Sequence, residues 1–154
     1  MNNKKVFIVS SSNAFTVIEI LAVVAIIALL SSVTVVALES YQPIIDLNGT
    51  TRQIIMDLRY VQQLAVSEQI KYGIQFFKDE NKYQIIKYNT PEEIINEKNL
   101  PAGITFYSIN GLSNGRVQFN PYGSVEEDGE IILLNSQTNT RTIQIKPSGF
   151  IKMQ

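Results

Sequence analysis

Glu19 places a carboxylate directly before nineteen residues, 20–38, that contain no charge. Burying an acid in such surroundings costs about 2.5–3.5 kcal/mol or more at membrane depth, so an acid at this place normally has a partner. The sequence contains no lysine or arginine between Lys5 and Arg52. The partner of Glu19 is therefore expected on another molecule, or as a new charge that processing of the chain creates.

A second group that could do chemistry is the string Glu126-Glu127-Asp128-Gly129-Glu130, which offers four carboxylates within five residues. Oxygen-rich clusters suit calcium, but the spacing does not match the D-x-[DN]-x-[DN]-G loop. Asp-Gly between two strand signals is typical of a hairpin turn, whose flanking acids are solvated. We therefore predict a turn here, with calcium binding as the alternative.

Histidine and cysteine are both absent from the 154 residues. The chain thus lacks the usual general base, the commonest metal ligand and every Ser-His or Cys-His arrangement. We interpret it as a non-enzyme and predict no catalytic residue, metal or cofactor. The net charge is −1, and no basic stripe is visible that would follow a phosphate backbone. DNA binding therefore has little support from charge.

The element that must position Glu19 is a long apolar helix. At about 1.5 Å per residue, residues 20–38 extend about 28 Å, close to the roughly 30 Å hydrocarbon core of a bilayer. We expect the helix to begin near Thr16, with Pro43 and then Asn48-Gly49 as points of kinking or interruption. The basic pair Lys4-Lys5 predicts a cytoplasmic N-terminus and a C-terminal part outside the cytoplasm.

Three other interpretations of this N-terminus compete. An ordinary secretory signal has a shorter apolar region of about 7–15 residues, although Val35-Val36-Ala37 could serve as its cleavage site. An uncleaved single-pass anchor explains the apolar run but not Glu19. A buried core helix is the least favoured, because nineteen uncharged residues exceed what a domain of this size usually buries.

The remainder of the chain predicts a helix followed by strands. An apolar stripe with helical spacing predicts an amphipathic helix packed on its own domain; it consists of Leu47, Ile54, Leu58, Val61 and Ala65. Alternating apolar residues then predict a hairpin over 72–76 and 83–88, and further strands at 104–109, 116–120, 130–134, 142–146 and 150–153. Residues 90–99 are polar and acidic, which favours a loop or a short helix.

The string Ala14-Phe15-Thr16-Val17-Ile18-Glu19, followed by the apolar run, resembles the processing and methylation segment of type IV pilins and pseudopilins. The resemblance implies that a prepilin peptidase cleaves between Ala14 and Phe15, that Phe15 is then N-methylated, and that Glu19 is the retained acid. The new amine of Phe15, in the same or a neighbouring subunit, would supply the missing cation. Ala14 stands where the family usually has glycine.

Three further strings, in this order, resemble the minor GspH/FimT-like pseudopilins: Leu100-Pro-Ala-Gly-Ile-Thr-Phe, Val117-Gln-Phe-Asn-Pro-Tyr-Gly and Ile143-Gln-Ile-Lys-Pro-Ser-Gly. The resemblance implies a pilin-like α+β fold, in which a long N-terminal transmembrane and amphipathic α-helix packs on a C-terminal antiparallel β-sheet domain. The implied domains are a leader (1–14), a transmembrane and polymerisation helix (15–42) and an exported α+β domain (43–154).

The function that this resemblance implies is a minor pilin or pseudopilin, placed near the tip of a type IV pilus, a type II secretion pseudopilus or a competence pseudopilus. The implied partners are other pilin subunits, the prepilin peptidase and methyltransferase, an inner-membrane assembly platform and membrane lipid. The implied location is the cytoplasmic membrane and then the filament. A membrane-anchored extracellular module that captures a ligand or DNA without polymerising is the alternative, and an enzyme with a signal anchor is the third class.

Overall fold

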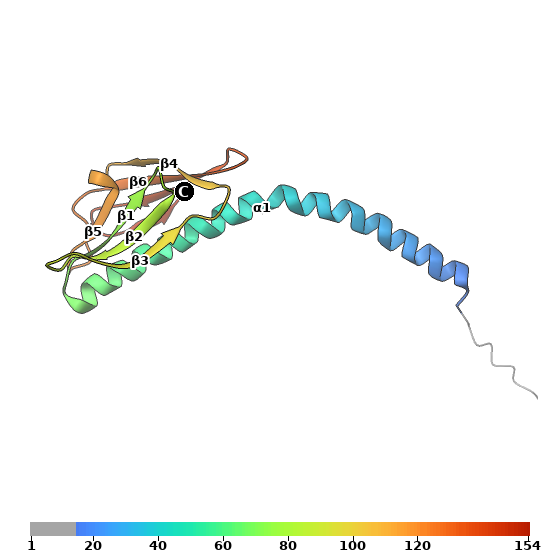
Figure 1. Ribbon diagram of the computed structural model, residues 1–154, viewed down its shortest axis with the longest axis horizontal. Coiled ribbons are helices and arrows are strands. Elements are labelled where there is room, and N and C mark those ends of the chain that lie inside the picture. The colour runs from blue at the N-terminus through green and yellow to red at the C-terminus, as the bar shows by residue number, and fades with distance from the viewer. Residues whose placement is uncertain (1–14) are drawn as a thin grey trace, which may run out of the picture. The chain divides into compact units, whose positions relative to one another are not determined.

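The computed structural model describes residues 15–154, and for residues 32–40 it describes the backbone only. In this described part, a single α-helix, α1 (Val17–Glu68), is followed by eight strands (Figure 1). The chain divides into two units, Met1–Glu39 and Ser40–Gln154. Of the first unit, the structure describes Phe15, Thr16 and the first part of α1; the second unit contains the remainder of α1 and the eight strands.

Helix α1 is interrupted neither at Pro43 nor at Asn48-Gly49, so the predicted interruption is wrong at both places. Proline removes one backbone hydrogen bond and glycine has low helix propensity. Most helical stability in proteins comes, however, from the packing of an apolar face. The predicted stripe supplies that face, because all five of its side chains are fully buried: Leu47, Ile54, Leu58, Val61 and Ala65.

The strands form two antiparallel sheets of four. The first sheet has the order β3-β2-β1-β5, with β1 (Tyr72–Phe77), β2 (Lys82–Lys87), β3 (Glu93–Asn99) and β5 (Arg116–Phe119). The second sheet has the order β4-β6-β7-β8, with β4 (Ile104–Asn110), β6 (Gly129–Asn135), β7 (Thr140–Ile145) and β8 (Ile151–Met153). A short 3₁₀ turn, η1 (Ser113–Gly115), precedes β5.

One core joins α1 to both sheets. Buried residues alternate along the strands as the sequence predicts, and Ile74 of β1 lies opposite Ile85 of β2. The ring of Phe76 is 5.8 Å from that of Tyr83 in the same sheet and 5.7 Å from that of Phe106 in the second sheet, measured between centroids. The second unit is therefore an α+β structure, as expected.

Two predictions about this unit are wrong. The segment expected to be a loop or short helix forms the edge strand β3, which pairs with β2 along its whole length. Because nearly all of its side chains are exposed, β3 lacks the buried alternation that marks a strand in the sequence. The Asp128-Gly129 turn does not close a hairpin either, since β5 and β6 belong to different sheets and the acidic string connects them.

Candidate functional site

Glu19 lies in the first turn of α1, where Thr16 caps the helix. The backbone N–H of Glu19 donates to the hydroxyl oxygen of Thr16 at 3.3 Å and to its carbonyl oxygen at 3.1 Å. A threonine followed three residues later by glutamate is the capping-box pattern, which satisfies free N–H groups at a helix start. A carboxylate in this turn is also favoured by the helix dipole. The local sequence therefore fixes where the acid stands relative to the helix start.

The structure places Phe15 and Glu19 at the same end of α1 without pairing them. Phe15 precedes the helix and its side chain is 78 % exposed. Within residues 15–31 and 41–154, whose side chains are described, no ion pair or hydrogen bond is made by the Glu19 carboxylate. Ala14, on the other side of the predicted cleavage, lies outside the described residues.

The helix around Glu19 exposes apolar side chains in all directions. Every large apolar residue from Phe15 to Leu30 is at least half exposed, the least exposed being Val23 at 51 %. A helix that exposes apolar side chains on every side must be surrounded by other apolar groups. Part of the predicted apolar run, residues 32–38, lies outside the residues whose side chains are described.

Among the described residues, no helix has both the length and the hydropathy of a membrane span.

Two acids of the 126–130 string have different partners. Glu126 forms an ion pair with Lys71 at 3.2 Å. Glu127 accepts hydrogen bonds from the hydroxyl and the backbone N–H of Ser113, at 2.6 and 2.7 Å, and these bonds lower the pKa of Glu127. In the described residues, no three acidic side chains converge as a metal site would require. The arrangement gives the calcium alternative no support.

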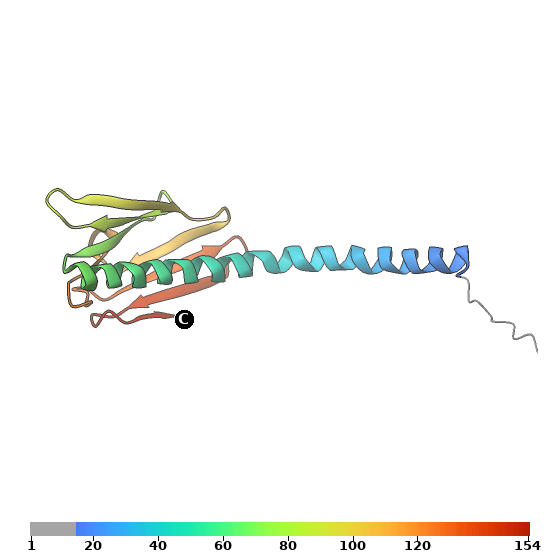
Figure 2. The same cartoon turned by 90° about the horizontal axis from the view of Figure 1, so that it is seen from below.

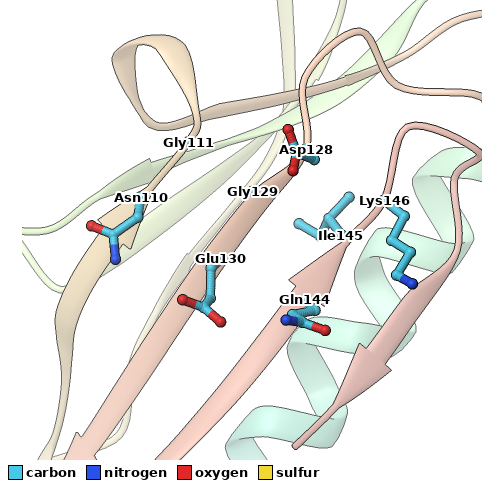
Figure 3. A pocket seen from close by; sticks show the side chains of 8 residues that line it. All are labelled: Asn110, Gly111, Asp128, Gly129, Glu130, Gln144, Ile145 and Lys146. Atoms are coloured by element: carbon cyan, nitrogen blue, oxygen red, sulfur yellow. The ribbon is translucent and has the colours of Figure 1, made fainter.

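A hollow of about 320 Å³ lies beside this string on the second sheet (Figure 3). Asn110, Glu130 and Gln144 line it from three neighbouring strands, in direct register with one another. Asp128 lies at its end, at the turn into β6, and Lys146 lies on the far side of β7 (Figure 3). The hollow is open and polar, and no described contact within it indicates a ligand.

Asp57 is the centre of a buried polar cluster that joins α1 to β2 and β3. Both of its carboxylate oxygens accept from the Lys98 ammonium at 2.8 Å, and one also accepts from the Tyr83 hydroxyl at 2.6 Å. Gln53, one turn earlier in the helix, donates at 3.2 Å. Burial, followed by the bond to Asp57, raises the pKa of the Tyr83 phenol. With its charges matched, the cluster holds the edge strand β3 against the helix.

Gln62 of α1 brings together two of the strings that carry the resemblance to the GspH/FimT-like group. Its side-chain amide donates to the carbonyl oxygens of Gly123 at 2.7 Å and Gly149 at 3.1 Å. Both glycines have positive φ, 81° and 79°. A Cβ on Gly149 would stand only 2.0 Å from the Gly123 oxygen. The two turns therefore pack on each other and on the helix, and this role is structural.

The roles of Asp57, Lys98 and Gln62 were not predicted from the sequence. One signal for Asp57 was present, because it lies beside Leu58 on the buried face of the helix, where an acid needs a partner. The partners themselves are 26 and 41 residues away, beyond the reach of spacing arguments. Gln62 gave no signal of its own.

Comparison with known proteins bears on the fold. No family model and no curated protein sequence matches the chain. Among solved structures, the minor pseudopilin EpsH of the type 2 secretion system of Vibrio cholerae is similar, with a TM-score of 0.63 and 9 % identity over 71 % of this chain and 96 % of that one. The type IV minor pilin FimU of Pseudomonas aeruginosa strain PAO1 is similar with a TM-score of 0.58 and 17 % identity, over 70 % of this chain and 87 % of that one.

The fold is that of minor pilins and pseudopilins. At these identities the likeness establishes fold, and it confirms the pilin-like α+β architecture expected from the three C-terminal strings and the N-terminal segment. The pilin-like fold explains why a long helix is followed by antiparallel strands in this chain.

Proposed function

We propose that this pilin-like chain is a minor pilin or pseudopilin subunit of a type IV pilus, a type II secretion pseudopilus or a competence pseudopilus. The observation that carries the proposal is Glu19, an acid without a described partner at the start of a helix whose apolar side chains are exposed all round. The likeness of fold to EpsH and FimU supports it. The role is structural rather than catalytic.

In the proposed mechanism, a prepilin peptidase cleaves between Ala14 and Phe15 and the new amine of Phe15 is methylated. This amine pairs with Glu19 of the same or a neighbouring subunit as helices gather into a bundle. A misplaced buried acid costs several kcal/mol, whereas a correctly paired one gains little over an apolar neighbour. Glu19 therefore sets the register of the subunit rather than supplying the energy of assembly.

The proposed partners follow from this mechanism: other pilin subunits, the prepilin peptidase and methyltransferase, an inner-membrane assembly platform and membrane lipid. Before assembly the subunit stands in the cytoplasmic membrane through residues 15–42. The leader 1–14 faces the cytoplasm and the domain 43–154 lies outside. Residues 20–38, free of charge and long enough to cross a bilayer as a helix, support this placement.

The test is Glu19→Gln, compared with wild type and with Asp46→Asn as the matched control. Asp46 is an exposed acid on the same helix but lies beyond the apolar run. Glu19→Gln should keep insertion and cleavage, because a neutral amide is easier to bury and the cleavage lies at Ala14. Its incorporation into sheared filaments, relative to the membrane fraction, should fall at least about tenfold, the equivalent of roughly 1.4 kcal/mol.

Asp46→Asn should be incorporated like wild type. Equal incorporation of Glu19→Gln and wild type would show that Glu19 is not an assembly residue. If the wild-type chain remained in membranes and never entered filaments, the non-polymerising binding module would replace the present proposal.

A further inference from the structure

Within the unit Ser40–Gln154, α1 lies to one side of the strands of both sheets (Figure 2). A hollow of about 490 Å³ opens between one turn of this helix and the chain around the end of β3. Its volume is in the range of about 300–1,000 Å³ that is usual for small-molecule sites. We name it the α1–β3 hollow; its wall includes Gly49, Thr50 and Gln53 of α1, Lys98 and Asn99 of β3, and Pro101.

Gly49 keeps the helix side of this hollow open. Glycine is among the least favourable residues in a helix interior, so its presence there often has a packing reason. Within the described residues no neighbour requires it, because a Cβ on Gly49 would meet no heavy atom within 4 Å. The space that a side chain would fill at this position is therefore part of the hollow.

Thr50 presents a free hydroxyl to the same space. The residue is only 9 % exposed, yet within the described part of the chain its hydroxyl makes no hydrogen bond. The next residue differs, since the Thr51 hydroxyl donates to the Leu47 carbonyl oxygen at 2.6 Å. Among the described side chains, the polar atoms that are both enclosed and unpaired belong to Tyr88 and Asn135. The Thr50 oxygen is not one of them, so it faces the open space of the hollow.

Lys98 adds a donor to the hollow without adding net charge. Its ammonium has three N–H groups, and it donates to both carboxylate oxygens of Asp57 at 2.8 Å. The third N–H has no described partner, and the Lys98 side chain is 32 % exposed. Asp57 also accepts from Tyr83 and Gln53, which occupies its lone pairs. The described wall of the hollow therefore offers one unused donor, matched charges and no unpaired carboxylate.

The other polar groups in the wall of the hollow are amides. Gln53 and Asn99 are exposed, and a side-chain amide both donates and accepts hydrogen bonds. Leu100 and Pro101 contribute apolar surface beside them. The aromatic residue of the wall, Tyr83, is only 2 % exposed, so its ring is not open to stacking. The ligand that fits is uncharged, carries groups that both donate and accept hydrogen bonds, and has an aliphatic face.

Hydroxyl groups and aliphatic C–H groups occur together in this way in saccharides. A free anion such as phosphate would instead meet a lysine whose charge Asp57 already balances. We propose that the α1–β3 hollow binds a short, uncharged saccharide. The Thr50 hydroxyl, the unused N–H of Lys98 and the two amides bond its hydroxyl groups, and its C–H face lies against Pro101. The inference goes beyond the proposed function, because it holds whether or not the chain polymerises.

Nuclear magnetic resonance of the isotope-labelled full chain in dodecylphosphocholine micelles tests the site without a sugar-based detergent. The probes are cellobiose and N,N′-diacetylchitobiose, and at least one should shift the backbone signals of Thr50, Gln53 and Asn99 until they saturate. Two charged probes, inorganic phosphate and glucuronic acid, should shift these signals less. The absence of saturable shifts with both disaccharides, or larger shifts with the charged probes, would overturn the proposal.

Variants locate the binding within the chain. Gly49→Leu should abolish the shifts because its side chain fills the hollow, and the fold should survive because leucine favours a helix and its Cβ meets no neighbour. Thr50→Val removes the hydroxyl at nearly constant shape and should weaken binding about threefold or more. Gln63→Leu, at an exposed position of the same helix outside the hollow, is the matched control and should bind like wild type. Binding by Gly49→Leu at wild-type affinity would refute the site.

Polymers that contain the same sugar units distinguish the source of the ligand. Co-sedimentation of the full chain with cellulose or chitin, lost in Gly49→Leu, would identify a surface glycan. Binding of a soluble disaccharide without co-sedimentation would identify a free sugar, and both outcomes support the site. None of these measurements requires a filament, so failure of this inference would leave the proposed function standing.

Discussion

The side-chain amide of Gln62 donates a 2.7 Å hydrogen bond to the carbonyl oxygen of Gly123, and so ties the C-terminal part of α1 to a turn 61 residues further along the chain. The same amide reaches the carbonyl oxygen of Gly149. One helical side chain thus supports the turn that leaves the first sheet and the turn that joins β7 to β8 in the second.

Replacing Gln62 by methionine should therefore destabilise the chain. Methionine keeps the length of the side chain but leaves both carbonyl oxygens without this donor, at a cost of about 1–3 kcal/mol. The matched control is Gln63→Met, because Gln63 is the neighbouring glutamine of the helix and its side chain is exposed. Urea denaturation of the purified chain measures the difference. Equal midpoints for the two variants would mean that water replaces the amide at no cost.

Gly149→Ala should be more harmful than the equivalent change at Gly103. Both glycines have positive φ, 79° and 85°, so alanine costs about 1–2 kcal/mol at either position. Only at Gly149 does the new Cβ collide with backbone, at 2.0 Å from the Gly123 oxygen, whereas nothing lies within 4 Å at Gly103. We expect a further loss of about 1–3 kcal/mol for Gly149→Ala, measured by thermal unfolding. Similar losses at both positions would show that the turns separate without cost.

Removing the cation from the Asp57 cluster should cost more than neutralising the anion. The side chain of Asp57 is only 9 % exposed, whereas that of Lys98 is 32 % exposed and can turn toward solvent when it loses its partner. Lys98→Met leaves an uncompensated buried carboxylate, with an expected loss of about 3–5 kcal/mol. Asp57→Asn keeps an acceptor for Tyr83 and should cost clearly less. Denaturant unfolding of both variants measures the two losses of stability. A larger loss for Asp57→Asn than for Lys98→Met would contradict this prediction.

Low pH should destabilise the domain, because it protonates carboxylates that accept hydrogen bonds in the folded state. Hydrogen bonds from Lys87 and then Tyr72 hold the pKa of Glu68 below its ordinary value of 4.5. A carboxyl with a lowered folded pKa stabilises fully above the unfolded pKa, and this contribution is lost as the pH falls through the folded value. The urea midpoint should therefore fall below about pH 4.5. Glu68→Gln should reduce that fall, whereas Glu93→Gln should not, because the Glu93 carboxylate forms no ion pair among the described residues. A fall of equal size in all three proteins would exclude Glu68 as a contributor.

The sequence predicted those parts of the fold that rest on local periodicity. The stripe from Leu47 to Ala65 is buried because a 3.6-residue repeat forces those side chains onto one face. The hairpin of β1 and β2 also lies where alternation and a polar turn placed it. Whether Phe15 and Glu19 act as the resemblance implies remains a prediction.

Periodicity could not reveal what depends on distant parts of the chain. Strand β3 has no buried face of its own and is held by pairing with β2. The division into two sheets follows from which strands pair, and turn signals carry no information about that choice. In the sequence, nothing distinguishes Lys98 from an ordinary surface lysine. Its role depends on Asp57 of α1, which lies 41 residues away along the chain.

The ion pair of Lys98 with Asp57 also affects how copies of this chain can meet. An open sheet edge invites the strands of another molecule to continue the ladder, and charges within the edge strand oppose such growth. In β3, the Lys98 side chain points toward Asp57 of α1. The pairing of β3 with β2 also shifts register between Ile85 and Ile86, so the backbone of the edge strand is irregular there. Continuous sheets between copies are thereby disfavoured. Molecules crowded at high density can then associate through side chains, reversibly and in a defined orientation, without growing into an amyloid-like aggregate.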